Sequence, residues 1–217
     1  MDQKVEAAGE TGATRIQTQN RQIILEAALE VFAVNGLRGS TLDDIAARAG
    51  MSKPNLLYYF PRKREIYAAV LERTLAEWLD PFAAIDPTGD PVEELRRYIT
   101  CKLAHAAARP AASRLFANEI LSGAPVIGGF LATVLKPMVD EKAAIIRRWV
   151  VEGRLAPVDP YHLIFAIWAT TQHYADFDLQ VRAVLGGQVD RQGFREQSAQ
   201  AVLTIILNGV KPREPLR

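Results

Sequence analysis

The stretch TLDDIAARAGMSKPNLLYYFPRK, Thr41–Lys63, has the pattern of two short helices joined by a tight turn. Apolar residues recur at helical spacing in its first half, and Gly50 then predicts a stop, because glycine reaches positive φ at little cost. Ser52 can cap a second helix, and Pro54 stands in the first turn, where a missing N–H costs nothing. Two such helices around a glycine turn are the sequence form of a helix-turn-helix, whose second helix enters the DNA major groove.

The second helix of this motif carries polar, aromatic and basic side chains. No acidic residue stands between Lys53 and Arg64, so the segment can neutralise DNA phosphates. Asn55 can pair with a base edge, and Tyr58 can reach a base or a phosphate. The alternative is a helical hairpin whose basic end is merely solvated. The candidate DNA contacts are Thr41, Ser52, Lys53, Pro54, Asn55, Tyr58, Tyr59 and Lys63.

Residues 39–71, GSTLDDIAARAGMSKPNLLYYFPRKREIYAAVL, resemble the DNA-binding domain of TetR-type bacterial repressors. The matching features are a capping threonine, an Ile-Ala pair, Ala-Gly before the turn, and aromatic residues before a lysine. They stand at Thr41, Ile45–Ala46, Ala49–Gly50, Tyr59, Phe60 and Lys63. The resemblance implies an all-helical homodimer that binds a palindromic operator. It also implies a C-terminal domain that binds a small effector and thereby changes operator affinity.

A narrower resemblance is to the pyrimidine-responsive regulators of that family. It rests on LLYYFPRK at 56–63, ASRLFANEILSGAP at 112–125 and RLAPVDPYHLIFAIWATTQHYADF at 154–177. These segments lie in both halves of the chain, and the effector half is where TetR-type proteins normally diverge. The resemblance therefore implies uracil or thymine as the effector.

Helical spacing of apolar residues runs through nearly the whole chain, and no useful period-two strand pattern interrupts it, so the fold class expected is all-α. Residues 1–14 are polar and are expected to form a disordered arm. The DNA-binding domain is expected at 15–62, and the effector-binding and dimerisation domain at 63–217. The expected helices cover about 18–35, 42–49, 53–59, 62–79, 90–109, 111–121, a stretch to 151 kinked near Pro137, 159–184 and 190–207.

The last two expected helices are apolar on more than one face, which a monomer has difficulty hiding. In TetR-type dimers the corresponding helices form a four-helix bundle across the two-fold axis, so we expect a homodimer through them. The alternative is that these faces close the core of the monomer itself. In the final helix the apolar positions are Phe194, Ala201, Val202, Ile205 and Ile206.

Two polar residues, Thr171 and Gln172, interrupt an apolar stripe that also contains Trp168. A carboxamide can exchange two hydrogen bonds with a planar cis-amide, the edge that uracil and thymine present, and an indole can stack on the ring. The alternative is that Gln172 bonds to a neighbouring helix and that Trp168 only packs the core. Further ligand-binding candidates, chosen because TetR-type pockets lie between the linker helix and such helices, are Trp78, Phe82, Phe116 and Tyr174.

The composition is that of an ordinary globular protein: 217 residues, 49% hydrophobic, with a net charge of +1. A single cysteine, Cys101, excludes an internal disulfide and, with no signal core and no membrane-length apolar run, favours a cytoplasmic protein. No HExxH, G-x-S-x-G or phosphate-binding glycine loop is present, so we expect no enzyme, metal or cofactor. The remaining alternatives are a regulator of another small planar or hydrophobic ligand, and a DNA-binding module whose C-terminal half only dimerises.

Overall fold

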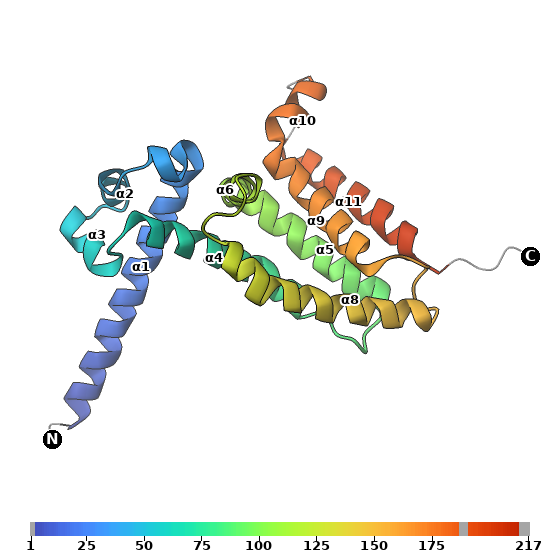
Figure 1. Cartoon of the computed structure of the whole chain (residues 1–217), viewed down its shortest axis with the longest axis horizontal. Helices are drawn as coiled ribbons and strands as arrows, with labels where there is room; N and C mark the ends of the chain where they lie inside the picture. Colours follow the sequence, from blue (N-terminus) through green and yellow to red (C-terminus); the bar gives the residue numbers. More distant parts are fainter. Residues whose placement is uncertain (1–2, 187–190, 213–217) are drawn as a thin grey trace, which may run out of the picture. The chain divides into compact units, whose positions relative to one another are not determined.

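The computed structural model describes residues 3–186 and 191–212, with side chains from 15 to 186 and from 193 to 212. Every regular element in these ranges is a helix (Figure 1). None of the described helices is long and apolar enough to cross a membrane. The all-α class expected from the periodicity is therefore confirmed.

The helices form two compact units, Met1–Arg73 and Thr74–Arg217, and the division falls inside helix α4, Lys63–Ala83. This division lies later than the expected boundary between residues 62 and 63. The reason is that the first turns of α4 belong to the core of the first unit. Ile66 is fully buried, and Tyr67 packs edge-on against Phe32 of α1, with 5.0 Å between ring centroids.

The first unit contains α1, Gln3–Gly39, α2, Leu42–Arg48, α3, Lys53–Tyr59, and the beginning of α4. Helix α1 is interrupted at Gly36, whose φ of 65° is in the left-handed region, as the Asn35-Gly36 pair predicts. The core of the first unit is built from apolar side chains of all four helices, among them Ile24, Ala28, Phe32, Ile45, Ala46, Leu56, Ile66 and Val70.

The start of α1 differs from the expected disordered arm. Residues 3–14 are helical and continuous with the rest of α1, and residues 1 and 2 lie outside the described residues. Extending an existing helix needs no new nucleus, so residues with good helix propensity, such as alanine and glutamate, can join it.

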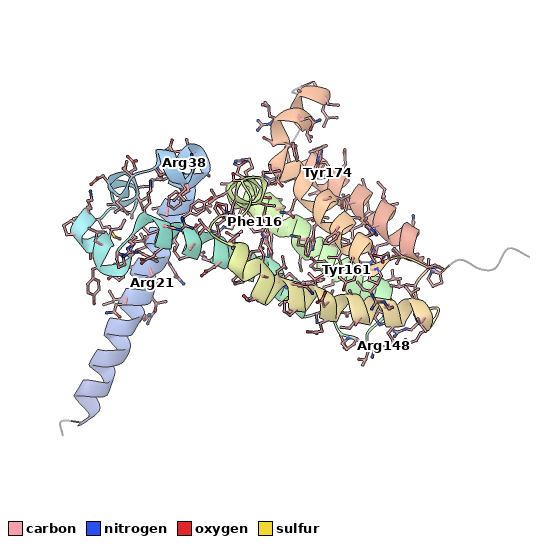
Figure 2. The ribbon with its side chains drawn as sticks, viewed as in Figure 1. Arg21, Arg38, Phe116, Arg148, Tyr161 and Tyr174 are labelled. Carbon is pink, nitrogen blue, oxygen red and sulfur yellow. The ribbon has the colours of Figure 1, made fainter. Side chains whose placement is uncertain are left out.

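Over its described residues, the second unit contains the end of α4 and seven further α-helices. Helix α5 packs against α9 and α11, and α6 and α8 also pack against α9 (Figure 1). Between α8 and α9, the hydroxyl of Tyr161 donates to Asp140 Oδ1 at 3.0 Å (Figure 2). The elements are α5, Pro91–Ala108, α6, Pro110–Leu121, α7, Gly128–Phe130, a π-helix η1, Leu131–Leu135, α8, Lys136–Val151, α9, Pro160–Asp176, α10, Asp178–Val184, and α11, Arg191–Val210.

Two helices of the second unit begin as the Asp-Pro pairs predict. Asp90 accepts a hydrogen bond from the backbone N–H of Glu93 at 3.0 Å, and Asp159 accepts one from His162 at 3.0 Å. The helix expected over 159–184, by contrast, breaks at Phe177, where φ is −113° and ψ is 30°. The periodicity continues across this break, so it gave no sign of it.

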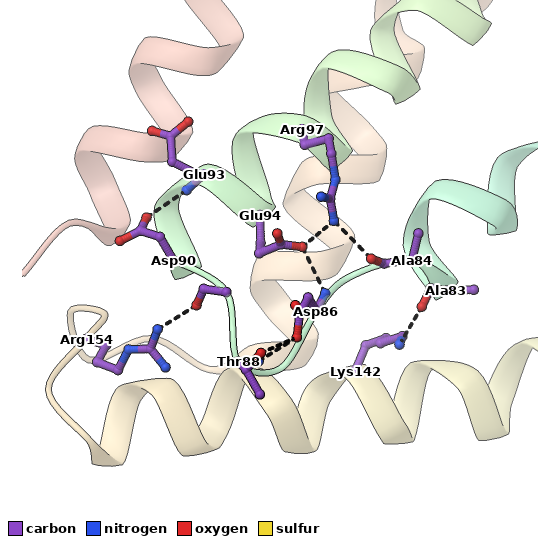
Figure 3. A network of polar contacts seen from close by, with 11 residues as sticks. Ala83, Ala84, Asp86, Thr88, Asp90, Glu93, Glu94, Arg97, Lys142 and Arg154 are labelled. Carbon is purple, nitrogen blue, oxygen red and sulfur yellow. Dashed lines mark hydrogen bonds and ion pairs between the residues drawn. The ribbon is translucent and has the colours of Figure 1, made fainter.

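The C-terminal end of α4 is fixed by cationic side chains (Figure 3). Lys142 Nζ donates to the carbonyl of Ala83 at 2.8 Å, and Arg97 donates to the carbonyl of Ala84 at 2.9 Å. Cations at a helix C-terminus satisfy free carbonyls and complement the helix dipole. The connection to α5 is therefore held in place, and with it the part of α4 that carries Trp78 and Phe82.

Candidate functional site

The helix-turn-helix forms with the caps that the sequence predicts. Thr41 and Asp44 form a capping box, in which the Thr41 hydroxyl accepts from the Asp44 N–H at 3.1 Å and Asp44 Oδ2 accepts from the Thr41 N–H at 3.0 Å. Ser52 caps α3 through the Asn55 N–H at 3.4 Å. Gly50 takes a φ of 66° in the turn between the two helices. The hydroxyls of Thr41 and Ser52 therefore cap the two helices, and this role in the fold is separate from any contact with DNA.

One face of α3 is exposed and polar. Lys53, Pro54 and Asn55 are exposed, and Tyr58 is 70% exposed. Leu56, fully buried, holds the opposite face against the unit's core. Four of the candidate DNA contacts are thus accessible along α3, three in its first turn and Tyr58 in its last.

Two other candidates, Tyr59 and Lys63, lie differently. The Tyr59 hydroxyl accepts from Asn20 Nδ2 of α1 at 2.8 Å, and the side chain is half-buried. The ammonium of Lys63 donates to the backbone carbonyl of Ser40, ahead of α2. Both residues therefore brace the motif, and Lys63 has only its remaining N–H groups to offer a phosphate.

Polar residues of α1 hold the end of α3, a contact that the sequence analysis missed. Gln17 Nε2 donates to the Tyr58 hydroxyl at 3.3 Å. Arg21 donates to the carbonyl of Tyr59 at 3.1 Å, and its guanidinium lies 4.2 Å from the centroid of the Phe60 ring (Figure 2). The only sequence signal is that residues 17, 20 and 21 share one helical face.

An aromatic cluster occupies the second unit between α4, α5, α6 and α9. Its edge-on ring pairs are Trp78 with Phe116 at 5.3 Å and Phe82 with Trp168 at 6.2 Å between centroids. Phe82 also lies 5.0 Å from Tyr98, whose hydroxyl accepts a hydrogen bond from Trp168 Nε1 at 2.7 Å. Four of the predicted ligand residues thus lie in one cluster, and Tyr98 joins them.

The two polar ligand candidates of α9, Thr171 and Gln172, differ in burial and in hydrogen bonding. Thr171 is buried, and its hydroxyl donates to the carbonyl of Ile167 at 2.7 Å, so its hydrogen-bonding capacity is largely used within its own helix. Gln172 is half-buried, and its side chain has no hydrogen bond to any residue whose side chain the structure describes. The carboxamide of Gln172 is therefore available to a ligand.

Lys102 of α5 is a buried charged residue that the sequence analysis did not single out. Its ammonium lies 4.5 Å from the centroid of the Trp78 ring. Burial lowers the pKa of Lys102 to about 8, while the charge of Asp176 acts in the opposite direction. The sequence signal for Lys102 is a lysine within the apolar stripe of residues 95–106, just as Gln172 is a polar residue within an apolar stripe.

A cavity of about 580 Å³ lies beside this region, between α5, α9, α10 and α11. Of the predicted ligand residues it is lined by Thr171 and Tyr174, and Tyr174 packs edge-on against Phe194 at 5.7 Å (Figure 2). Most of its other lining residues are apolar. Among the side chains that the structure places, no cluster of His, Cys, Asp and Glu could hold a metal ion.

A capped helix-turn-helix with an exposed polar recognition helix, followed by a helical unit with a cavity, defines a DNA-binding regulator. Residues 24–70 match the family described as bacterial regulatory proteins, tetR family, and residues 71–213 match the YcdC-like protein, C-terminal region. The chain belongs to the TetR family. It is a transcription regulator and not an enzyme.

Individual relatives agree with this assignment. The chain is 46% identical over 200 residues to the HTH-type transcriptional regulator RutR of Escherichia coli K12, covering 92% of this chain and 94% of RutR. It is 33% identical to the HTH-type transcriptional repressor SCO4008 of Streptomyces coelicolor, over 89% and 98% of the two chains. The crystal structure of SCO4942 from the same species superposes with a TM-score of 0.71 at 27% identity, over 89% and 99% of the two chains.

Proposed function

We propose that this regulator binds a palindromic operator as a homodimer and that uracil or thymine, bound in the second unit, changes its operator affinity. The observation that carries the effector assignment is the half-buried, unbonded carboxamide of Gln172, one turn from the ring of Trp168. A planar cis-amide would satisfy both ends of that carboxamide. We place the protein in the cytoplasm, with its DNA.

Support for the operator comes from the accessible face of α3. Lys53 and Asn55 present a cation and a carboxamide, groups that contact phosphates and adenine edges respectively. The Lys53 ammonium also forms an ion pair with Asp43 of α2 at 2.9 Å, so only its remaining N–H groups are open to a phosphate. A single recognition helix reads few bases, and TetR-type proteins resolve this by dimerising, so that two such helices meet one palindrome.

Support for the dimer comes from α11, where some apolar side chains are buried and others are exposed. Val202 and Ile206 are buried in the core of the monomer, whereas Ile205 is 70% exposed. On α9, Phe165 is 50% exposed and lies beside the small exposed residue Ala166. Exposed apolar and small side chains on the two helices that pair in this family are consistent with a four-helix bundle between two copies.

Support for a pyrimidine comes from the resemblance to RutR, a pyrimidine-responsive regulator, together with the position of Gln172. The apolar cavity beside Tyr174 favours a second possibility, a larger planar or hydrophobic effector. In a third possibility the second unit only dimerises, and no small molecule alters operator binding.

The deciding experiment is calorimetry of uracil and thymine against the wild type and Gln172→Leu, followed by operator binding with and without the ligand. Leucine keeps much of the volume but removes the carboxamide, so the variant should lose the pyrimidine response and keep operator binding. Ligand and operator must change each other's affinity by the same factor, because the coupling is reciprocal. Gln180→Leu, at an exposed position of α10, is the matched control.

No heat with the wild type would remove the pyrimidine assignment. Equal heats of ligand binding for the wild type and Gln172→Leu would instead mean that Gln172 does not contact the ligand and has only a structural role. A wild type that binds uracil but leaves operator affinity unchanged would favour the dimerisation-only function.

A further inference from the structure

Two rows of side chains, one on α5 and one on α9, face each other and follow the same N-to-C order. Tyr98 and Lys102 stand one turn apart on α5, and Trp168, Gln172 and Asp176 stand at successive turns on α9. The first members are joined by the Trp168–Tyr98 hydrogen bond of 2.7 Å, and Asp176 is the carboxylate whose charge acts on Lys102. Gln172 therefore lies on α9 between two points at which that helix faces α5.

Lys102 is buried without a hydrogen-bonding partner. It is 4% exposed, its ammonium lies over the Trp78 ring, and no hydrogen bond or ion pair joins it to any residue with a described side chain. Lys142, also 4% exposed, has the hydrogen-bonding partners that a buried lysine ordinarily needs. It donates to the Ala83 carbonyl at 2.8 Å and to Glu141 at 3.0 Å. The Lys102 Nζ atom is not among the fully buried polar atoms that lack a partner, so it keeps a little accessible surface. A largely buried ammonium without a protein acceptor costs stability, and this one can be reached by an acceptor that arrives from outside.

The neighbouring carboxylate does not serve as that acceptor. Asp176 accepts a hydrogen bond from the fully buried Ser113 hydroxyl at 2.5 Å, and among the described residues no ion pair joins it to Lys102. Burial raises the pKa of Asp176, and the nearby charges, Arg114 among them, oppose this. Asp176 is therefore held by α6 and leaves the Lys102 ammonium unpaired.

We propose that Lys102 contacts the effector, donating a hydrogen bond to a ring carbonyl of the same ligand whose amide edge pairs with Gln172. The inference rests on the proposed function and specifies its ligand as a cyclic amide or imide with two ring carbonyls. Lysine has three donors and no acceptor. A ring that carries an amino group in place of that carbonyl, such as cytosine, would set donor against donor and would be rejected.

The test compares the wild type with Lys102→Met and with Lys142→Met, a matched control at an equally buried lysine. Calorimetry with uracil should show affinity falling roughly tenfold to a hundredfold for Lys102→Met, the range expected for a lost hydrogen bond to a charged group. Lys142→Met should stay within about twofold of the wild type. Cytosine should give no heat with the wild type.

Without ligand, the unfolding temperature should change in opposite directions for the two variants. Lys102→Met should unfold at a higher temperature than the wild type, because methionine removes an unpaired buried charge at similar volume. Lys142→Met should unfold at a lower temperature, because it leaves the Ala83 carbonyl without its donor. A merely structural Lys102 would make both variants less stable.

The outcomes separate the two proposals. If the wild type binds uracil and Lys102→Met binds it equally well, or if Lys102→Met lowers the unfolding temperature, the Lys102 inference is wrong and the pyrimidine effector stands. If cytosine binds as well as uracil, the inferred carbonyl contact is wrong. If the wild type binds neither uracil nor thymine, the pyrimidine effector falls and the Lys102 inference falls with it.

Discussion

Trp168 Nε1 donates a hydrogen bond of 2.7 Å to the hydroxyl oxygen of Tyr98 and so joins α9 to α5. An indole has a single N–H, and here it is already used. Trp168 can therefore offer a ligand only its ring. Any polar recognition in this cluster has to come from side chains that still have free hydrogen-bonding groups, as Gln172 and Lys102 do.

Replacing Tyr98 with phenylalanine should lower the free energy of unfolding by about 1–3 kcal/mol, because the indole N–H of Trp168 would be left without an acceptor in a largely buried position. Urea denaturation followed by tryptophan fluorescence measures this change. Tyr174→Phe is the matched control, since no described hydrogen bond involves that hydroxyl. Equal losses for the two variants would mean that the Trp168–Tyr98 bond contributes nothing net.

Asn55→Ala should reduce discrimination between the operator and a scrambled sequence by about 1–3 kcal/mol, because a carboxamide on the exposed face of α3 can read a base edge. The Ser52 cap survives, since it uses the backbone N–H of residue 55. Lys53→Ala is the informative partner, because it should weaken binding to both sequences and reduce the salt dependence by about one phosphate contact. Fluorescence anisotropy at several salt concentrations measures both effects. Unchanged discrimination in Asn55→Ala would remove it from the base contacts.

The local architecture of the first unit was predictable from the sequence because its signals are local. Thr41 and Ser52 as caps, and Gly50 as a helix end, need only the backbone geometry of their own segment. The orientation of Tyr59 was not predictable in this way. Its hydroxyl turns toward Asn20, thirty-nine residues away, and a helical pattern does not identify such a partner.

The same limit applies to the second unit. Periodicity placed Trp168 and Gln172 on one stripe of α9, but it could not show that Tyr98 and Lys102 face them from α5. Lysine in an apolar stripe usually extends its ammonium to water, so the burial of Lys102, with its ammonium over the Trp78 ring, depends on how the helices pack. The cavity beside Tyr174 likewise depends on how α10 leaves α9 after the break at Phe177.

Ile205→Asp should shift the protein from dimer to monomer, because it would place an unpaired carboxylate in the expected interface. Operator affinity should fall steeply, since a monomer carries one recognition helix. Sedimentation velocity and operator anisotropy measure the two effects. Val151→Asp, at a residue of α8 that is 81% exposed, adds the same charge elsewhere and should leave both unchanged. A wild type that sediments as a monomer at working concentration would contradict the proposed dimer.

The free energy of unfolding should rise with pH in a way that depends on Lys102. Burial lowers its folded-state pKa from 10.5 to about 8, whereas the unfolded chain keeps the ordinary value. Between these values the unfolded chain binds a proton that the folded protein does not, so the folded state gains relative stability as pH rises through this window. The groups that act on Lys102 are the Trp78 ring of α4 and the carboxylate of Asp176 of α9, which in turn accepts from Ser113 of α6 and lies near the charge of Arg114.

Lys102→Met lacks this titration, so its stability advantage over the wild type should be largest near neutral pH and should shrink as the pH is raised from about 8 toward about 10. Burial raises the pKa of Tyr98, which lowers stability in strong alkali, but both proteins share that effect and it cancels in the difference. Urea denaturation of both proteins at pH values across this window measures the gap. A gap that stays constant would show that Lys102 titrates as a solvated lysine, with its ammonium reaching water in the folded protein.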